Sequence, residues 1–496
     1  MAIAATCGMT ACSDDFLEVE NPMAETIDTY FTTNEHVQEA LVAAYDPLHW
    51  PDWAMSQYNP LCIMSDIMAD QLWVGGSDKT DNQFWHLMMN YEALPTNCMT
   101  GIWTDAYSGV KRCNDVLTYI SWASDIPAES QKSYEAQARL LRVYYYSWLW
   151  KFWGNIPYYE KNLSGNFLCE QIGHDKVYAN MMADLEGVIS MNALPMKQDE
   201  KNYGRMTQAF AYMLYTELAL YQQDESRYAT ALGYMQEIIS SGKYALNPDY
   251  GKIFTEEGEW CDESIYEVIY KDDNAARSYD NPLYAGGTVL PRLIGPYNYA
   301  AGSGDAHANG WGFAPMRQET VDMFDDADAR KLATCWNAAA TGTYETRYQD
   351  TGWFLEKYAP TIAGNADQIA DTDLNYNCNL RIYRYAETLL NAAELLLRTG
   401  GSSATAKQYL NEVHNRSGLT DQREASLENI LDERRYEFVG EGKRYWDLIR
   451  FGEAANVLVP DSYGYRTNSW SESKKYLPIP QSEIDAAQNT LTQNNY

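Results

Sequence analysis

The spacing of apolar residues predicts a chain that is mainly helical. Apolar side chains recur every three to four positions, the period of a helix that buries one face. In the first such segment Val37, Leu41, Ala44 and Leu48 form one stripe, and Asn34 is the expected N-cap. The segments with this period are 34–48, 102–120, 129–153, 207–222, 227–241, 381–398 and 404–416.

Two pairs of these helices indicate a repeated helical hairpin. The segments 207–222 and 227–241 form one pair, and 381–398 and 404–416 form the other. Repeats of about 34 residues with small residues where the helices meet are typical of tetratricopeptide hairpins, which stack because one pair cannot bury its own face. The full tetratricopeptide consensus is not met and the pairs are not contiguous. We therefore expect a mainly α, tetratricopeptide-like scaffold interrupted by other segments.

Between residues 243 and 377 the helical period largely disappears. Residues 265–270 and 353–358 are expected to form short strands. Residues 284–313 alternate glycines with aromatic residues, and residues 71–90 form a second irregular stretch that contains glycines and tryptophans. Long irregular loops usually carry function, so these two stretches are the first places to look for a site.

The segment 427–452 combines helical spacing with eleven charges. The pattern predicts a helix, a tight corner at Gly440 and Gly442, and a second short helix. Charged residues lie too close to apolar neighbours for all to be solvated, and buried charges persist only when they are paired. We expect Glu433, Arg434, Glu437 and Arg444 to lock the corner through arginine–carboxylate bonds. An active site built on Glu433 and Glu437 is the less favoured alternative.

The amino-acid composition favours some classes of ligand and excludes others. The chain has 40 Tyr and 15 Trp, more than a core requires, and these residues suit polar ligands with apolar faces. A formal charge of −32 argues against binding to nucleic acid, whose phosphates need basic surface. The nine cysteines and six histidines form no CxxC, HExxH or zinc-type spacing, so no metal site and no cofactor are expected. Most cysteines are expected to be core thiols.

Three sequence blocks resemble one family. ERRYEFVGEGKRYWDLIRFG at 433–452, RLLRVYYYSWLWKFWGNIPY at 139–158, and YLPIPQSEI at 476–484 resemble conserved blocks of the SusD/RagB family. These are surface lipoproteins with which Bacteroidetes capture glycans. The resemblance implies one SusD-like domain over residues 13–496, with an N-terminal part at about 13–225 and a C-terminal part at about 260–496.

The resemblance also implies a location and a partner. Met9, Thr10 and Ala11 before Cys12 look like a bacterial lipobox, so residues 1–12 are interpreted as the remnant of a lipoprotein signal that ends at the lipidated Cys12. No stretch of 18 apolar residues is present, so no segment is expected to span a membrane. The lipid would instead hold the protein at the cell surface on the outer membrane. The family implies a SusC-like TonB-dependent transporter as partner, to which captured oligosaccharide is delivered without catalysis.

The candidate binding residues come from the two irregular stretches. Sugar recognition needs flat aromatic faces together with groups that hydrogen-bond hydroxyls. The family usually builds its glycan site from two corresponding regions. The candidates for the faces are Trp73, Trp85, Tyr297, Tyr299 and Trp311. The candidates for the hydrogen bonds are Asp78, Asn82, Asn298 and Asp305.

Two alternatives remain open from the sequence. The first is a peptide-binding SusD-like importer component, because abundant tyrosines and carboxylates suit peptides too. The second is an α-rich glycoside hydrolase, which needs two carboxylates at a set separation. The candidates are Asp325, Asp326 and Asp328, and a solvated run before Arg330 is the simpler interpretation.

Overall fold

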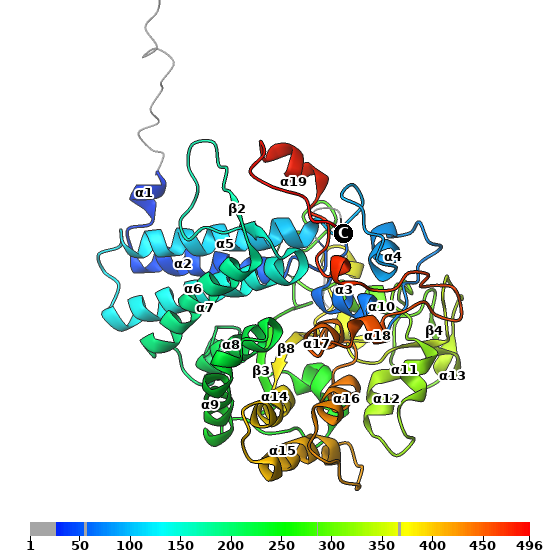
Figure 1. Ribbon diagram of the computed structural model, residues 1–496. Helices are drawn as coiled ribbons and strands as arrows, with labels where there is room; N and C mark the ends of the chain where they lie inside the picture. The colour runs from blue at the N-terminus through cyan, green and yellow to red at the C-terminus, as the bar shows by residue number, and fades with distance from the viewer. Residues whose placement is uncertain (1–25, 54–56, 285, 366–368) are drawn as a thin grey trace, which may run out of the picture.

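The computed structural model describes residues 26–53, 57–284, 286–365 and 369–496. Cys12 and the proposed signal remnant lie outside these residues. Figure 1 shows long helices gathered on one side of the molecule and irregular segments with short helices on the other. The mainly α fold class predicted from the sequence is confirmed.

The first part of the chain forms a helical layer. Its helices are α1 (Ile27–Tyr30), α2 (Asn34–Tyr45), α3 (Leu61–Met68), α4 (Gln83–Met89), α5 (Gly101–Ile120), α6 (Ala128–Trp153) and α7 (His174–Met191). The long helices α5 and α6 pack closely because Gly109 has no side chain: a Cβ there would lie 2.4 Å from the ring of Tyr145. Helix α6 ends where Gly154 takes a positive φ of 70°.

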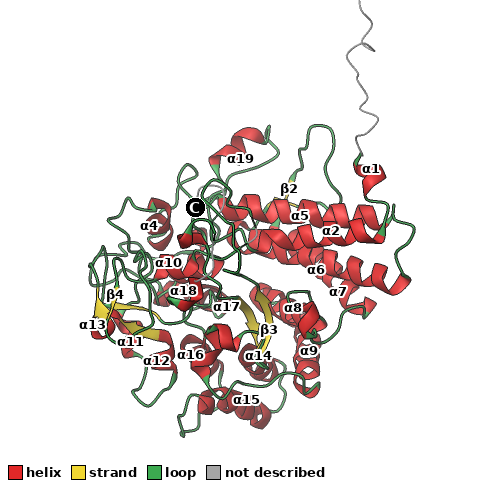
Figure 2. Ribbon diagram, turned by 180° about the vertical axis from the view of Figure 1, so that it is seen from behind, coloured by secondary structure: helices red, strands yellow, loops and turns green. Residues whose placement is uncertain are grey.

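The predicted hairpins are present and stack across the interruption between them. They are α8 (Gln208–Gln222) with α9 (Tyr228–Ser240), and α14 (Tyr385–Arg398) with α15 (Ser403–Arg416). Each helix from α5 to α9 packs against the next, and α14 packs against α9 although about 140 residues separate them in the chain. Non-contiguous repeats therefore form one continuous row, which Figure 2 shows from behind.

Two local predictions are corrected. Residues 380–384 form a strand rather than the first turn of α14, because their backbone pairs with an earlier strand. The N-cap of α2 is Thr33, whose hydroxyl accepts from the His36 N–H, so Asn34 is already helical.

The middle of the chain contains short elements. Its helices are α10 (Leu290–Ile294), α11 (Gln318–Asp322), α12 (Arg330–Thr334) and α13 (Ala338–Thr341). The strands pair as β1 (Ile156–Pro157) with β2 (Gln171–Ile172), β3 (Ser264–Val268) with β8 (Leu380–Arg384), β4 (Ala300–Ala301) with β6 (Gly342–Thr343), and β5 (Cys335–Asn337) with β7 (Trp353–Leu355). All four pairings are antiparallel.

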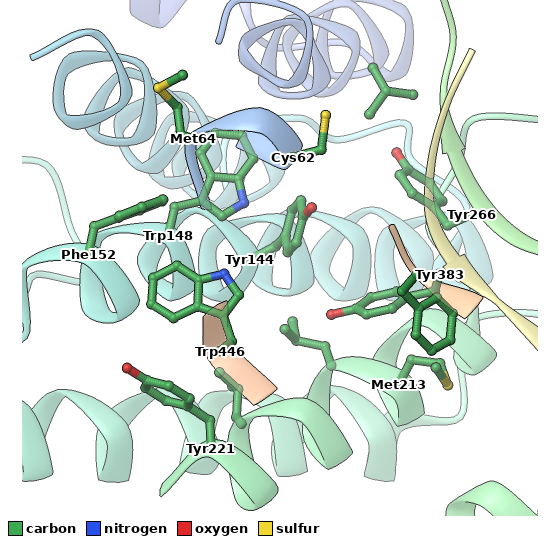
Figure 3. Close-up of a cluster of buried hydrophobic side chains, with 14 of the residues drawn as sticks. Cys62, Met64, Tyr144, Trp148, Phe152, Met213, Tyr221, Tyr266, Tyr383 and Trp446 are labelled. Carbon is green, nitrogen blue, oxygen red and sulfur yellow. The ribbon is translucent and has the colours of Figure 1, made fainter. Parts of the chain in front are cut away.

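A core rich in large rings holds the helical layer to the C-terminal helices. In Figure 3 the ring of Trp446 on α17 (Arg444–Arg450) lies between the side chains of α6 and Tyr221 of α8, with its centre 5.0 Å from that of Phe152 and 5.7 Å from that of Tyr221. Lys151 on the same face of α6 forms a salt bridge with Glu217 of α8 at 2.5 Å. One cluster of buried apolar residues extends from Val37 to Ile479. The seven cysteines in the described part of the chain are free thiols, and four of them are buried.

The predicted helical corner forms as expected. Helix α16 (Leu427–Glu437) leads through Gly440 and Gly442, both with positive φ, into α17 (Arg444–Arg450). The remaining helices are α18 (Ala454–Val457) and α19 (Gln481–Ala486).

The four charged side chains predicted to lock this corner are buried and paired. Glu433 binds Arg330 at 2.6 Å, and Arg434 binds Asp447 at 2.8 Å and Glu387 at 3.1 Å. Glu437 is fully buried among arginines, and Arg444 binds Asp70 at 2.9 Å. Each charge has a partner from a distant part of the chain. The segment therefore has a structural role, since it ties distant parts of the chain together.

Candidate functional site

The two irregular stretches of the sequence meet in the structure. The backbone N–H groups of Trp73 and Gly75 donate to the carbonyls of Pro315 and Phe313 at 2.8 and 2.9 Å. The chains approach so closely that a Cβ on Gly75 would lie 1.9 Å from the carbonyl oxygen of Gly312. This contact explains the glycine at position 75, because a larger residue there would collide with the facing backbone.

Burial removes three of the predicted aromatic faces from the candidate site. Trp73 and Trp85 are 1% and 0% exposed, and Tyr299 is also buried. The indole N–H of Trp85 donates to the Tyr58 carbonyl at 2.8 Å, and Arg317 covers the ring of Trp73 at 3.6 Å. A ring without exposed faces cannot stack on a sugar, so these predictions are wrong. Trp73 and Trp85 belong to the main core, and Tyr299 packs against Trp336 in a separate small cluster.

Trp311 instead stands at one end of a continuous row of rings. Its ring lies 5.5 Å from that of Tyr58, Tyr58 lies 4.5 Å from Trp53, and Trp53 lies 5.6 Å from Tyr279. Successive ring planes are turned by 64°, 32° and 75°, so the rings are tilted relative to one another. Tyr279 is 39% exposed and the other three are partly exposed. We call these four residues the ring arc.

One buried ion pair positions two members of the ring arc. Asp52 and Arg277 are buried and lie 2.7 Å apart. Asp52 directly precedes Trp53, and Arg277 lies two residues before Tyr279. The Arg277 guanidinium also donates to the Trp53 carbonyl at 2.6 Å. The two chain segments are therefore tied together beneath their exposed rings.

Charged groups border the other end of the arc. Arg292 lies 5.8 Å from the centre of the Trp311 ring and forms a 2.7 Å salt bridge with Asp373. Arg347 donates to the Trp311 carbonyl at 2.8 Å and lies 4.3 Å above the ring of Tyr297. Its second partner is Asp81 at 3.4 Å. Charged groups next to ring faces suit a ligand with many hydroxyls and apolar C–H surfaces.

The tyrosine hydroxyls of the arc stay protonated in the neutral range. Burial raises the pKa of the Tyr58 hydroxyl. Burial and the neighbouring Tyr58 together raise the pKa of the Tyr279 hydroxyl. Both hydroxyls can therefore donate hydrogen bonds as well as accept them.

The remaining predicted residues lie in different settings. Asp78 is exposed and accepts from the N–H of Thr80 at 2.7 Å, and Asn298 is exposed with a φ of 50°. The amide nitrogen of Asn82 is buried and has no hydrogen-bond partner among the described residues. Asp305 binds His307 at 2.6 Å in a small cluster around Trp336. Tyr297 is partly exposed beneath Arg347, next to the arc.

Sequence reasoning missed Trp53, Tyr58 and Tyr279. The only available signal was their place near glycine- and proline-containing loops, which many other aromatic residues share.

No group of three or more His, Cys, Asp or Glu side chains that could hold a metal ion lies within the described ranges. Of the carboxylates considered for hydrolysis, Asp328 is buried and bound to Arg330 at 2.9 Å, contrary to its predicted solvation.

Comparison with known proteins gives matches over most of the chain. Residues 189–496 match the SusD family, and residues 15–220 match a family described as starch-binding and associating with the outer membrane. Surface glycan-binding protein A from Bacteroides thetaiotaomicron is 61% identical, with a TM-score of 0.91 over 94% of this chain and 100% of that chain. Its structure in complex with laminarihexaose is 60% identical, with the same TM-score and coverage. Starch-binding protein SusD from the same organism is 24% identical over 85% of this chain and 87% of that protein.

Proposed function

The chain belongs to the SusD family, and from that premise we propose that it binds laminari-oligosaccharides at the ring arc and delivers them to a SusC-like TonB-dependent transporter. The relatives are named as glycan-binding proteins, and the chain is a binding protein rather than an enzyme. The burial of Asp328 against Arg330 agrees with this, because a paired, covered carboxylate cannot reach a glycosidic bond.

The ring arc carries the proposal for the site. Four partly exposed rings that contact one another offer apolar surface to successive sugar units. The related protein that is 60% identical has a structure in complex with laminarihexaose, which supports this ligand class. Arg292, Arg347, Asp81 and Asp373 supply hydrogen-bonding groups at the border of the arc.

The anchor and the partner complete the proposal. A lipid on Cys12 would hold the protein at the cell surface, where captured oligosaccharide is concentrated at the transporter. Among the described residues, no helix has the length and apolar character needed to cross a bilayer. The match to a family described as associating with the outer membrane supports this location.

Calorimetric titration of the purified protein tests the ligand. Laminarihexaose, a maltohexaose control and a peptide mixture are titrated in turn, and reducing ends are assayed after incubation with laminarin. We expect heat only with laminarihexaose and no new reducing ends. Binding only to peptides would support a peptide importer instead, and released reducing ends would make the chain a hydrolase.

Single substitutions test the site. Trp311→Ala and Trp53→Ala should each weaken laminarihexaose binding about thirtyfold, because a stacking ring contributes on the order of 2 kcal/mol. Both rings are partly exposed, so the melting temperature should change little. Trp122→Ala, which removes another exposed indole after α5, is the matched control and should bind normally. Normal binding by both arc variants would place the site elsewhere.

A further inference from the structure

A second group of exposed rings lies outside the ring arc. Tyr463 and Tyr465 are stacked with their ring centres 5.7 Å apart and their planes only 20° from parallel. Tyr348 adds a third ring, 6.2 Å from Tyr465. Tyr463 is 53% exposed, and Tyr348 and Tyr465 are partly exposed. We call these three residues the tyrosine platform.

The loop that carries the platform is held firmly by its own carboxylate. Asp461 accepts from the backbone N–H groups of Tyr463 at 2.7 Å, of Tyr465 at 3.2 Å, and of Arg466. The loop between α18 and the C-terminal segment is thus folded around one side chain. Tyr463 and the partly exposed Tyr465 are therefore presented at fixed positions, which lowers the entropy lost when a ligand binds.

A buried arginine fixes the same loop to the core. Arg466 is fully buried and donates to the carbonyls of Met89 at 2.9 Å and Ala69 at 2.7 Å. Beneath the platform, the buried ring of Trp73 meets Tyr465 edge to face at 5.1 Å and Tyr463 at 6.1 Å. Trp73 thus supports exposed rings although it is not exposed itself.

Amide and acidic groups border the platform. Asn90 accepts from the N–H groups of Thr467 at 2.7 Å and Asn468 at 3.1 Å, and the Asn468 amide donates to Glu92 at 2.7 Å. The side chains of Thr467 and Glu92 are exposed. Stacked ring faces bordered by amides and carboxylates are the groups that pyranose rings and their hydroxyls require.

The platform and the ring arc are joined by two consecutive residues. Arg347 contacts Tyr297 and the Trp311 carbonyl beside the arc, and the next residue, Tyr348, contacts Tyr465 of the platform. The backbone N–H of Tyr348 donates to the Gly76 carbonyl at 3.0 Å, which fixes this junction. The arc and the platform are therefore connected through adjacent residues of one chain segment.

We propose that the tyrosine platform is a second carbohydrate-binding surface for the same class of glucan as the ring arc. It contributes to affinity mainly when the ligand is a polysaccharide. The proposal rests on the proposed function of the arc. A second contact on one long chain raises the overall affinity through effective concentration even when its own affinity is low. A short oligosaccharide that fills the arc gains nothing from it.

The test compares laminarihexaose with laminarin polysaccharide. Tyr463→Ala should leave the affinity for laminarihexaose within about twofold and weaken the retardation of the protein in a laminarin gel about tenfold or more. Tyr463→Phe keeps the stacking face and should behave as the unchanged protein. Phe167→Ala, which removes an exposed ring from the loop between β1 and β2, is the control and should also be retarded normally.

A second measurement does not depend on substituting the platform. Hydrogen exchange of the segment 461–468 is measured with and without laminarin in the Trp311→Ala variant, which weakens the arc. We expect laminarin to slow exchange in this segment. Unchanged exchange there, or normal retardation of Tyr463→Ala by laminarin, would overturn the inference and leave the arc intact as the site. Failure of the unchanged protein to bind either glycan would instead overturn the proposed function.

Discussion

Replacing Glu437 by glutamine tests whether the corner between α16 and α17 stabilises the fold rather than forming part of the binding site. The carboxylate is fully buried and lies 3.0 Å from Arg384 and 3.2 Å from Arg330, with Arg416 as a third partner. Glutamine keeps the shape of the side chain, removes its charge and replaces one acceptor oxygen with an NH2 donor. Three buried guanidinium groups then lose the anion between them.

The size of the effect follows from the ionisation of this carboxyl. Burial by itself would raise the pKa of Glu437, but the guanidinium groups of Arg416, Arg384 and Arg330 hold it at about 2, below the ordinary value of 4.5. At about 1.4 kcal/mol for each pH unit, the ionised carboxylate contributes about 3 kcal/mol to the free energy of unfolding. Removing one partner from a buried ion cluster costs about 3–5 kcal/mol, which agrees.

The sign of the pH dependence is determined by the lowered pKa. A carboxyl whose pKa is lower in the folded state stabilises the protein fully above its unfolded value of 4.5 and loses that contribution as pH falls toward 2. The difference in free energy of unfolding between the unchanged protein and Glu437→Gln should therefore be about 3–5 kcal/mol at pH 7 and shrink below pH 4.5.

Urea unfolding followed by circular dichroism at pH 7, 5 and 3.5 measures this difference. The control is Glu428→Gln on the same helix, whose side chain is exposed, and its effect should stay within about 0.5 kcal/mol. Laminarihexaose affinity per folded molecule should be unchanged in both variants. A Glu437→Gln protein that is as stable as the unchanged one but binds no glycan would show that the corner belongs to the site and refute the reasoning.

Three further outcomes are expected. Trp85→Ala should lower the free energy of unfolding by about 3–5 kcal/mol in a urea titration, because it empties a core site; unchanged stability would contradict its role in the core. Cys12→Ala should give an unlipidated protein that leaves the membrane fraction in cells without the partner transporter, and retention there would contradict the anchor. His307 has a raised pKa because its hydrogen bonds to Glu356 and Asp305 outweigh burial. The stability lost in His307→Gln should therefore be largest below pH 6.5 and decline as pH rises, as thermal melts at pH 5.5 and 8.5 would reveal; an equal loss at both would exclude a charged His307.

The sequence by itself determined the helices, the corner and the family. Apolar spacing is a local property, so it located α5, α6, α8 and α15 to within a residue or two. The positive φ of Gly440 and Gly442 is equally local, because glycine adopts that conformation without a steric penalty. The pairing of Glu433, Arg434, Glu437 and Arg444 was predictable in kind, because a charge among apolar neighbours needs a partner. Their actual partners were not predictable, since Arg330 and Asp70 come from distant segments.

Only the tertiary structure decided which rings face solvent. Trp73 and Trp85 lie in glycine-rich stretches like Trp311, yet the pairing of residues 72–76 with 312–316 buries the first two rings and leaves the third partly exposed. Trp53 and Tyr279 are 226 positions apart in the chain and meet because Asp52 and Arg277 pair beneath them. The exposure of a ring depends on which distant segments cover it. The periodicity of its own segment does not indicate which segments those are.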